Sequence, residues 1–266
     1  MTERILSVQH LNAFQEYLQR EEKSAVTVEK YLRDVRAFVT FEEGRSITKG
    51  VTIAFKKELE ERHYAVRSIN SMLASLNSIL EFMGWTDCKV KTLRCQRQIY
   101  CAVEKELTKA EYMRLLEASK RQVQLNLVMQ TICGTGIRVS ELQYFTVEAV
   151  RRGEVSVHCK SKIRTILVPG KLKRLLLEYA RQKKITSGVI FVSRNGAPLN
   201  RSNIWAQMKR LCKAANVNPE KVFPHNLRKL FARTFYGIEK DIAKLADILG
   251  HGSIETTRIY IMTTGI

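Results

Sequence analysis

The chain has 266 residues, and its 45 lysines and arginines against 26 aspartates and glutamates give a formal net charge of +19. A hydrophobic fraction of 45% is enough to bury a core, which excludes a disordered polymer. The sequence contains no run of roughly 18 apolar residues, so no membrane-spanning helix is predicted. It also contains no phosphate-binding loop and no dinucleotide fingerprint, so binding of ATP or NAD is not predicted. The charge favours a polyanionic partner, with nucleic acid as the first candidate.

The six cysteines contain no C-x-x-C pair, and the histidines do not complete a zinc pattern. We therefore interpret the cysteines as reduced and mostly structural, and we expect neither a metal nor another cofactor. The first ten residues, MTERILSVQH, lack the apolar core of a signal peptide. Together these features predict a cytoplasmic protein without a membrane partner.

Apolar residues at helical spacing predict four short helices in the first 87 residues. The clearest stripe runs from Ile69 to Met83, and Gly84 follows where the glycine of a helix C-cap belongs. Helices of this length and pattern suit a small bundle. Their expected ranges are 8–20, 27–41, 52–62 and 69–83.

Between residues 88 and 105 the periodicity is lost, and five basic residues accompany a single acidic one, Glu104. We interpret 88–105 as a linker between an N-terminal domain, 1–87, and a C-terminal domain, 106–266. Two interpretations of its charge stay open: the linker follows a DNA backbone, or it is a solvated tether.

The C-terminal domain is expected to combine helices with one strand pair. Thr108 and Glu111 form a capping box at a helix start, and a later helix, 123–132, ends in Gly134-Thr-Gly136. Residues 154–159 alternate like a strand that returns, beyond a polar turn, as 164–168. Further helices are expected at 137–142, from 171 onward, and at 203–215, 225–236, 242–249 and 254–260. The fold prediction is mainly α with a small antiparallel β-sheet.

The C-terminal domain also carries, in order, the side chains that phosphodiester chemistry requires. That chemistry needs a nucleophile, cationic donors for the non-bridging oxygens, an acid for the leaving oxygen and a partner for the nucleophile's proton. Arginines suit the second task because each offers a planar fork of donors that stays charged. The candidates are Arg138, Lys160, His225, Arg228, His251 and Tyr260.

These motifs closely resemble the tyrosine recombinase (phage integrase) family. The matching boxes are G-x-G-x-R-x-x-E-L at 134–142, H-x-L-R at 225–228, and L-G-H at 249–251 with a tyrosine nine residues further on. The stretch C-K-S-K-I-R-T-I-L-V-P resembles the hairpin that carries the family's lysine, and residues 24–38 resemble the second helix of its core-binding domain. One box alone is weak evidence, whereas all of them in order are strong.

The resemblance covers nearly the whole chain and implies a four-helix core-binding domain followed by an α+β catalytic domain of the DNA breaking-rejoining enzyme type. It implies that Arg138 and Arg228 clamp the scissile phosphate, with Glu141 supporting Arg138. It also implies a lysine of the hairpin turn as general acid, Lys160 in preference to Lys162.

The remaining roles concern the nucleophile. The resemblance implies that Tyr260 attacks phosphorus to give a 3′-phosphotyrosyl enzyme and a free 5′ hydroxyl. His225 would hydrogen-bond the phosphate or help to deprotonate the tyrosine, and His251 would position the site. This sequence departs from the family at Cys159 and Ser161, where glycines are common, and at Asn226, where aspartate is common.

The implied substrate is double-stranded DNA at specific recombination sites, bound by a homotetramer on two sites, with accessory DNA-bending proteins as possible further partners. Integration or excision of a mobile element and resolution of replicon dimers both stay open, as does the regulation of assembly, because six residues follow Tyr260 where the family usually has more. Residues 151–184, with eleven basic and two acidic residues, are expected to face DNA. The alternatives are a type IB topoisomerase-like enzyme and a non-catalytic DNA-binding protein.

Overall fold

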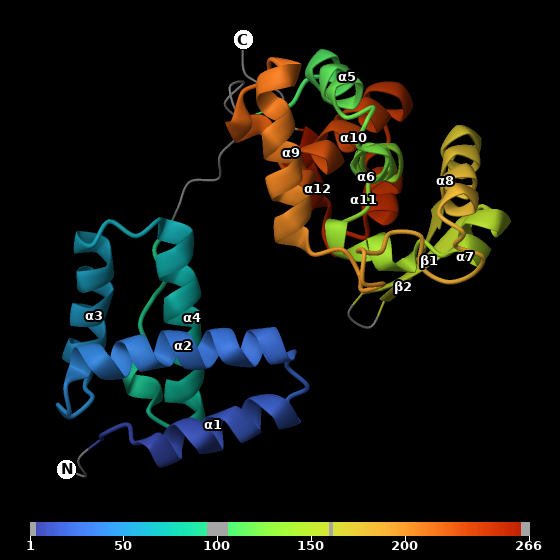
Figure 1. Ribbon diagram of the computed structural model, residues 1–266. Helices are drawn as coiled ribbons and strands as arrows, with labels where there is room; N and C mark the ends of the chain where they lie inside the picture. Colours follow the sequence, from blue (N-terminus) through green and yellow to red (C-terminus); the bar gives the residue numbers. More distant parts are fainter. Residues whose placement is uncertain (1–3, 95–105, 160–161, 262–266) are drawn as a thin grey trace. The chain divides into compact units, whose positions relative to one another are not determined.

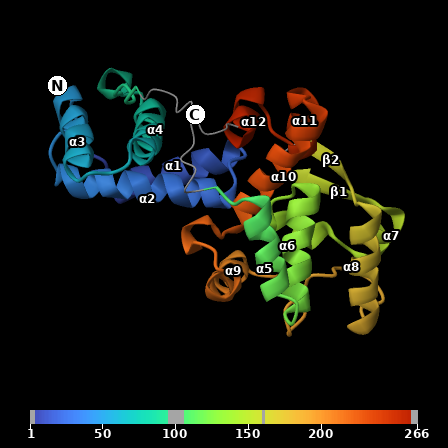
Figure 2. The ribbon, with the colours of Figure 1, turned by 90° about the horizontal axis from the view of Figure 1, so that it is seen from above.

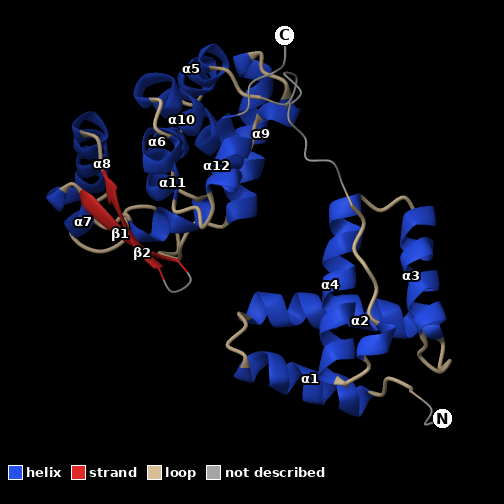
Figure 3. Cartoon of the chain, turned by 180° about the vertical axis from the view of Figure 1, so that it is seen from behind, coloured by secondary structure: helices blue, strands red, loops and turns tan. Residues whose placement is uncertain are grey.

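The computed structural model describes residues 4–94, 106–159 and 162–261, and the chain divides into two compact units, Met1–Arg97 and Gln98–Ile266 (Figure 1). The described residues are mostly helical and contain one antiparallel strand pair, drawn in red in Figure 3. The predicted fold class is thereby confirmed. No helix in the described part of the chain is long and apolar enough to cross a membrane.

The first unit contains the four predicted helices. The predicted starts of the second, third and fourth helices lie two or three residues too late. The second and third begin earlier because Ser24 and Thr48 cap them: the side chain of each accepts a hydrogen bond from a backbone N–H of the first turn. The helices are α1 (Val8–Arg20), α2 (Ala25–Glu42), α3 (Lys49–Glu61) and α4 (Val66–Phe82), followed by the short 3-10 helix η1 (Thr86–Cys88).

An apolar core joins these helices. Phe14, Phe38 and Leu73 are fully buried, and each such side chain contributes roughly 1.5–3 kcal/mol by leaving water. Residues 88–94 belong to the same unit, since Val90 is buried in this core and the Asn70 amide bonds the backbone of Leu93 at 3.0 and 2.7 Å. The linker was expected to begin at residue 88, whereas the structure places residues 88–94 in the first unit.

The second unit is built around α6, which lies against α5, α8, α9 and α10 (Figure 2). α6 is apolar on several faces, with Leu125, Val128, Met129 and Ile132 buried, as expected for a central helix. The elements are α5 (Lys109–Ala118), α6 (Val123–Thr135), η3 (Val139–Tyr144), α7 (Val147–Arg152), β1 (Glu154–Cys159), β2 (Lys162–Leu167), α8 (Gly170–Gln182), α9 (Arg201–Ala215), η4 (Pro219–Lys221), α10 (Pro224–Glu239), α11 (Ile242–Leu249) and α12 (Ile254–Ile261).

The strand pair follows the predicted alternation. Val155 and Val157 of β1 are buried, and opposite them on β2 stand Ile166 and Arg164. Arg164 is therefore a charged residue on the inward face of β2. The helix expected at 137–142 is instead the 3-10 helix η3, and it begins at Val139 because Arg138 is its N-cap, with φ −77° and ψ 150°.

The last three helices pack into a small core of their own. Ala232 of α10, Leu245 and Leu249 of α11, and Tyr260 of α12 form one buried cluster. The tyrosine proposed as nucleophile is therefore held by a packed helix rather than by an exposed loop.

A glycine substitution tests the packing of this second unit. Gly136 ends α6 with a φ of +67°, and a Cβ atom there would lie 2.4 Å from Cδ1 of Phe231. We expect Gly136→Ala to lower the free energy of unfolding by about 2–5 kcal/mol, of which the left-handed backbone costs about 1–2 and overpacking about 1–3 kcal/mol. Urea unfolding measures this loss.

Gly153→Ala is the matched control. Gly153 also ends a helix at positive φ, +88°, but the nearest atom to its added Cβ is Nζ of Lys173 at 3.9 Å. It should lose only the backbone part, about 1–2 kcal/mol. Equal losses of unfolding free energy in the two variants would show that Phe231 moves aside without an energetic penalty.

Candidate active site

Five of the six predicted residues come together in the structure. Arg138, His225, Arg228 and Tyr260 line one cavity of about 180 Å³, together with Arg201 at the start of α9. The ring of His251 lies directly behind, 4.7 Å from the ring of Tyr260 between centroids. These side chains come from η3 and its approach, α9, α10, the turn after α11, and α12.

Arg228 is the buried centre of the group, with 1% of its surface exposed. Pro224 opens α10 in the first helical position, where its fixed φ suits a helix start, and His225 and Arg228 then share one face. Nη1 of Arg228 donates to the carbonyl of Gly136, and Nη2 donates to the carbonyl of Leu249 at 2.6 Å. Burial, followed by the charge of Arg138, lowers the pKa of Arg228 to about 10, so the guanidinium stays charged at neutral pH.

Three arginines donate hydrogen bonds to three consecutive backbone carbonyl groups at the C-terminus of α11. The carbonyl of Ile248 accepts from Arg164, that of Leu249 from Arg228, and that of Gly250 from Arg138, the last at 3.4 Å. The last carbonyls of a helix lack partners within the helix and carry the negative end of its dipole. The guanidinium groups are thus paired with partial negative charges of backbone carbonyls, which do not change with pH.

Arg138 is oriented by Glu141, as the sequence suggested. Oε1 of Glu141 lies 3.0 Å from Nη1 of Arg138, and Oε2 accepts from the backbone N–H of the same arginine at 2.7 Å. Oε2 also pairs with Arg164. The Glu141 side chain is only 5% exposed, so this carboxylate is shared between two arginines away from water.

His251 is fixed at both ring nitrogens. Its Nε2 lies 3.0 Å from Nη2 of Arg228, and its Nδ1 lies 2.9 Å from Oγ1 of the buried Thr257. Because a guanidinium can only donate, Nε2 accepts and Nδ1 carries the proton. Burial, followed by the charges of Arg228 and Arg138, lowers the pKa of His251 to about 4, which agrees with a neutral ring.

His225 and His251 enclose Tyr260 from two sides. The ring of His225 stands edge-on to that of Tyr260 at 5.1 Å between centroids, and the guanidinium carbon of Arg228 lies 5.8 Å from the tyrosine ring. Burial, followed by the charges of Lys229 and Arg228, lowers the pKa of His225 to about 4 as well. Tyr260, 9% exposed, therefore lies between two neutral imidazoles and next to a buried cation.

The predicted general acid, a lysine of the hairpin turn, cannot be placed in the same way. Lys160 falls outside the described residues, and of Lys162 the structure describes the backbone at the start of β2. The preference for Lys160 over Lys162 stays a prediction.

Two supporting residues escaped the sequence analysis. Thr257, which holds His251, gives no signal in the sequence beyond its place near Tyr260. Arg164 was counted in the basic strip 151–184, yet its side chain is only 11% exposed and turns into the site. The signal that could have found Arg164 is its position on the inward face of β2, opposite the buried Val157.

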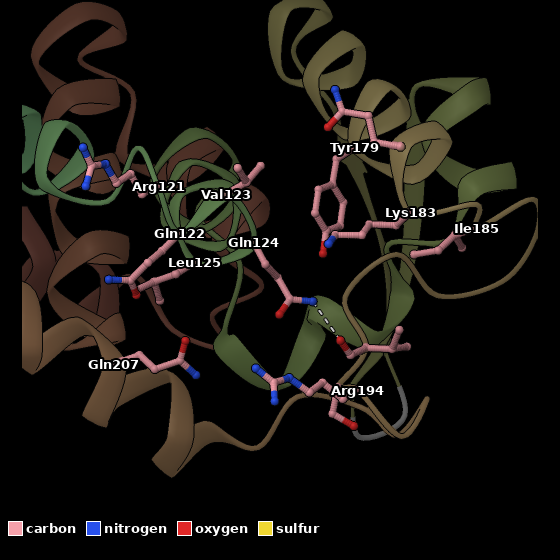
Figure 4. A pocket seen from close by; sticks show the side chains of 13 residues that line it. Arg121, Gln122, Val123, Gln124, Leu125, Tyr179, Lys183, Ile185, Arg194 and Gln207 are labelled. Atoms are coloured by element: carbon pink, nitrogen blue, oxygen red, sulfur yellow. Dashed lines mark hydrogen bonds between the residues drawn. The ribbon is translucent and has the colours of Figure 1, made fainter.

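A larger cavity, of about 760 Å³, lies elsewhere in the second unit (Figure 4). Arg121, Tyr179, Lys183 and Arg194 are among the residues that line it, and the Gln124 amide donates across it to the carbonyl of Val192 at 2.7 Å. None of the predicted catalytic residues lines this cavity. The candidate site is therefore identified by the predicted catalytic side chains that line it, and not by the volume of its cavity.

Comparisons with known proteins agree with the fold and with the motifs. Residues 105–264 match the phage integrase family, and residues 11–86 match the N-terminal SAM-like domain of phage integrases. The chain is 31% identical to tyrosine recombinase XerA of Pyrococcus furiosus, over 99% of this chain and 93% of that protein.

Solved structures share the fold. A lambda integrase dimer bound to a COC′ core site aligns with a TM-score of 0.76 at 17% identity, over 97% of this chain and 78% of the other. A lambda integrase tetramer bound to a Holliday junction aligns with a TM-score of 0.72 at 20% identity, over 95% and 76%. The predicted arrangement of a SAM-like domain followed by a catalytic domain is confirmed. The chain belongs to the phage integrase family.

Proposed function

We propose that this protein is a site-specific DNA recombinase that cuts and rejoins DNA through a covalent bond between Tyr260 and a backbone phosphate. The observation that carries the proposal is the position of Tyr260, which lines one small cavity with Arg138, Arg228 and His225. A structural tyrosine in an apolar core needs no such cationic surroundings.

The chemistry follows from the residues present. The Tyr260 hydroxyl attacks phosphorus, the bond from phosphorus to the 5′ oxygen breaks, and a 3′-phosphotyrosyl bond forms. His225, which is neutral, takes the tyrosine's proton, and a lysine of the hairpin turn, Lys160, gives a proton to the leaving 5′ oxygen. Arg138 and Arg228 hold the non-bridging oxygens, where charge grows in the transition state. One phosphoester replaces another, so the step needs no ATP.

Rejoining reverses these events with a different strand. The free 5′ hydroxyl of a partner strand attacks the phosphotyrosyl bond, the same imidazole returns the proton to Tyr260, and the lysine takes the proton of the attacking hydroxyl. Integration or excision of a mobile element and resolution of replicon dimers consist of this same exchange, so both fall under one proposal.

The proposed partner is double-stranded DNA, and the proposed assembly is a homotetramer on two sites. The charge of +19 supports the first, since phosphate contacts by lysine and arginine supply affinity. The lambda integrase structures, a dimer bound to a core site and a tetramer bound to a Holliday junction, support the second through their common fold.

The nucleophile is tested with a nicked suicide DNA, from which the cleaved fragment diffuses away and leaves the covalent complex trapped. We expect the complex with the unaltered protein and none with Tyr260→Phe, because the ring contacts remain while the attacking oxygen is gone. A denaturing gel detects the adduct.

Tyr236→Phe serves as control, since Tyr236 lies on α10 and is only partly buried in the same small core. It should form the adduct normally. An adduct with Tyr260→Phe would refute the assignment, and plasmid relaxation without recombination of paired sites would favour a topoisomerase instead.

The phosphate clamp is tested by Arg228→Lys. Lysine keeps the charge but cannot reach the carbonyls of Gly136 and Leu249 while donating to phosphate. We expect cleavage to slow by about 10²–10³, the loss associated with one transition-state donor. Single-turnover cleavage at saturating DNA measures the effect.

Arg233→Lys is the matched variant for comparison. Arg233 lies on the same helix, pairs with Glu106 at 2.8 Å and does not line the cavity. If both substitutions slow cleavage equally, Arg228 has no special part in the chemistry.

The proton transfer by His225 and the hydrogen bond that His251 accepts from Arg228 both require neutral rings in the free protein. NMR titration should place both midpoints near 4, well below the ordinary value of 6.5, and bound DNA should raise them because an anion favours the charged ring. The unfolded chain takes up these protons first, so the two groups add stability above about pH 6.5 that is lost as the pH falls toward 4. Midpoints near 6.5 in the free protein would contradict the buried, cationic site.

A further inference from the structure

Arg164 stands out among the basic residues of the second unit because it is turned inward. It lies on β2 opposite Val157, on the face of the hairpin that is buried, and its side chain is 11% exposed. A surface cation that binds DNA needs exposure, so this arginine has a different task.

The guanidinium of Arg164 contacts two separate supports of the site. Nη2 pairs with Oε2 of Glu141, the carboxylate that also orients Arg138. Nη1 donates to the carbonyl of Ile248 in the last turn of α11. The two following carbonyls of that turn accept from Arg228 and Arg138, and His251 comes next in the chain.

The turn after α11 is built to admit this side chain. Gly250 has a φ of +62°, and a Cβ atom there would lie 2.7 Å from Cδ and 3.0 Å from Nε of Arg164. The absent side chain leaves the space that the arginine fills. Arg164 is therefore packed as well as hydrogen-bonded, and it joins the hairpin, η3 and α11 at one point.

We propose that Arg164 is a positioning residue of the recombination site, which fixes Glu141 and the last turn of α11 and thereby the directions of Arg138 and His251. The inference rests on the proposed function. Arg164 is not among the described residues that line the cavity that would hold the phosphate. Its effect is on the geometry of the clamp and not on DNA affinity.

Electrostatics separates this role from a general effect on folding. The charge of Arg164 is one of the causes that lower the pKa of His251, together with burial, Arg228, Arg138 and His225. The largest causes that lower the pKa of His225 are burial, Lys229, Arg228, Arg201 and Arg138. Removal of the Arg164 charge should therefore raise the pKa of His251 more than that of His225.

The test compares Arg164→Gln and Arg164→Lys with Arg114→Gln in the full chain. Arg114 is the matched control because it also holds the last carbonyls of a helix, those of Ala215 at 2.9 Å and of Asn216 at 3.1 Å beyond α9, but far from the cavity. Single-turnover cleavage of the nicked suicide DNA gives the rate, and fluorescence anisotropy gives the dissociation constant.

We expect Arg164→Gln to cleave saturating DNA at least about tenfold more slowly while its dissociation constant changes less than about twofold, because a displaced clamp costs rate rather than binding. Arg164→Lys keeps the charge and one donor and should recover part of the rate, and Arg114→Gln should cleave normally. An unaltered rate for Arg164→Gln, or weaker binding with an unaltered saturated rate, would overturn the proposal.

Histidine NMR supplies a readout that does not depend on catalysis. In Arg164→Gln the titration midpoint of His251 should rise, and it should rise by more than that of His225. If the unaltered protein formed no adduct with DNA, the proposed function would fail, yet this titration would still test the contact. Equal shifts of both histidines, or none, would overturn it. If Arg164→Gln did not fold, Arg164→Lys would carry the rate measurement, with a slower rate supporting the role and an unaltered rate opposing it.

Discussion

The last turn of α11 is the element on which the site depends, because three guanidinium groups end on its three consecutive carbonyls. Like charges gathered in a buried place repel one another and lose water, and such a group is stable only when negative partners surround it. Here the partners are the free carbonyl end of a helix and one shared carboxylate, that of Glu141. Backbone carbonyls cannot be protonated, so the cationic site keeps its partners over a wide range of pH.

The same crowding of positive charge determines the state of the histidines. His251 is half-buried and His225 is exposed, but both rings stand beside arginines, and both pKa values fall to about 4. A neutral imidazole can accept a proton from a tyrosine or a hydrogen bond from a guanidinium, and His251 does the latter through Nε2. The arginines that would bind a phosphate thus also prepare the groups that would act beside it.

The position of Tyr260 follows from packing rather than from polar contacts alone. Its ring closes the small core formed by α10, α11 and α12, and one side of it borders the cavity lined by Arg138 and His225. That packing fixes the ring at the border of the cavity, as the proposed attack on phosphorus requires.

The sequence by itself determined most of the helices, the strand pair and the five residues that come together in the candidate site, because these depend on short-range features: apolar periodicity, capping residues, and boxes of fixed spacing around Arg138, Arg228 and Tyr260. Only the tertiary structure decided that Arg164 contacts this site and that Glu141 serves two arginines. Those contacts join residues 23 and 84 positions apart, and no local pattern records which carbonyl a distant guanidinium will reach.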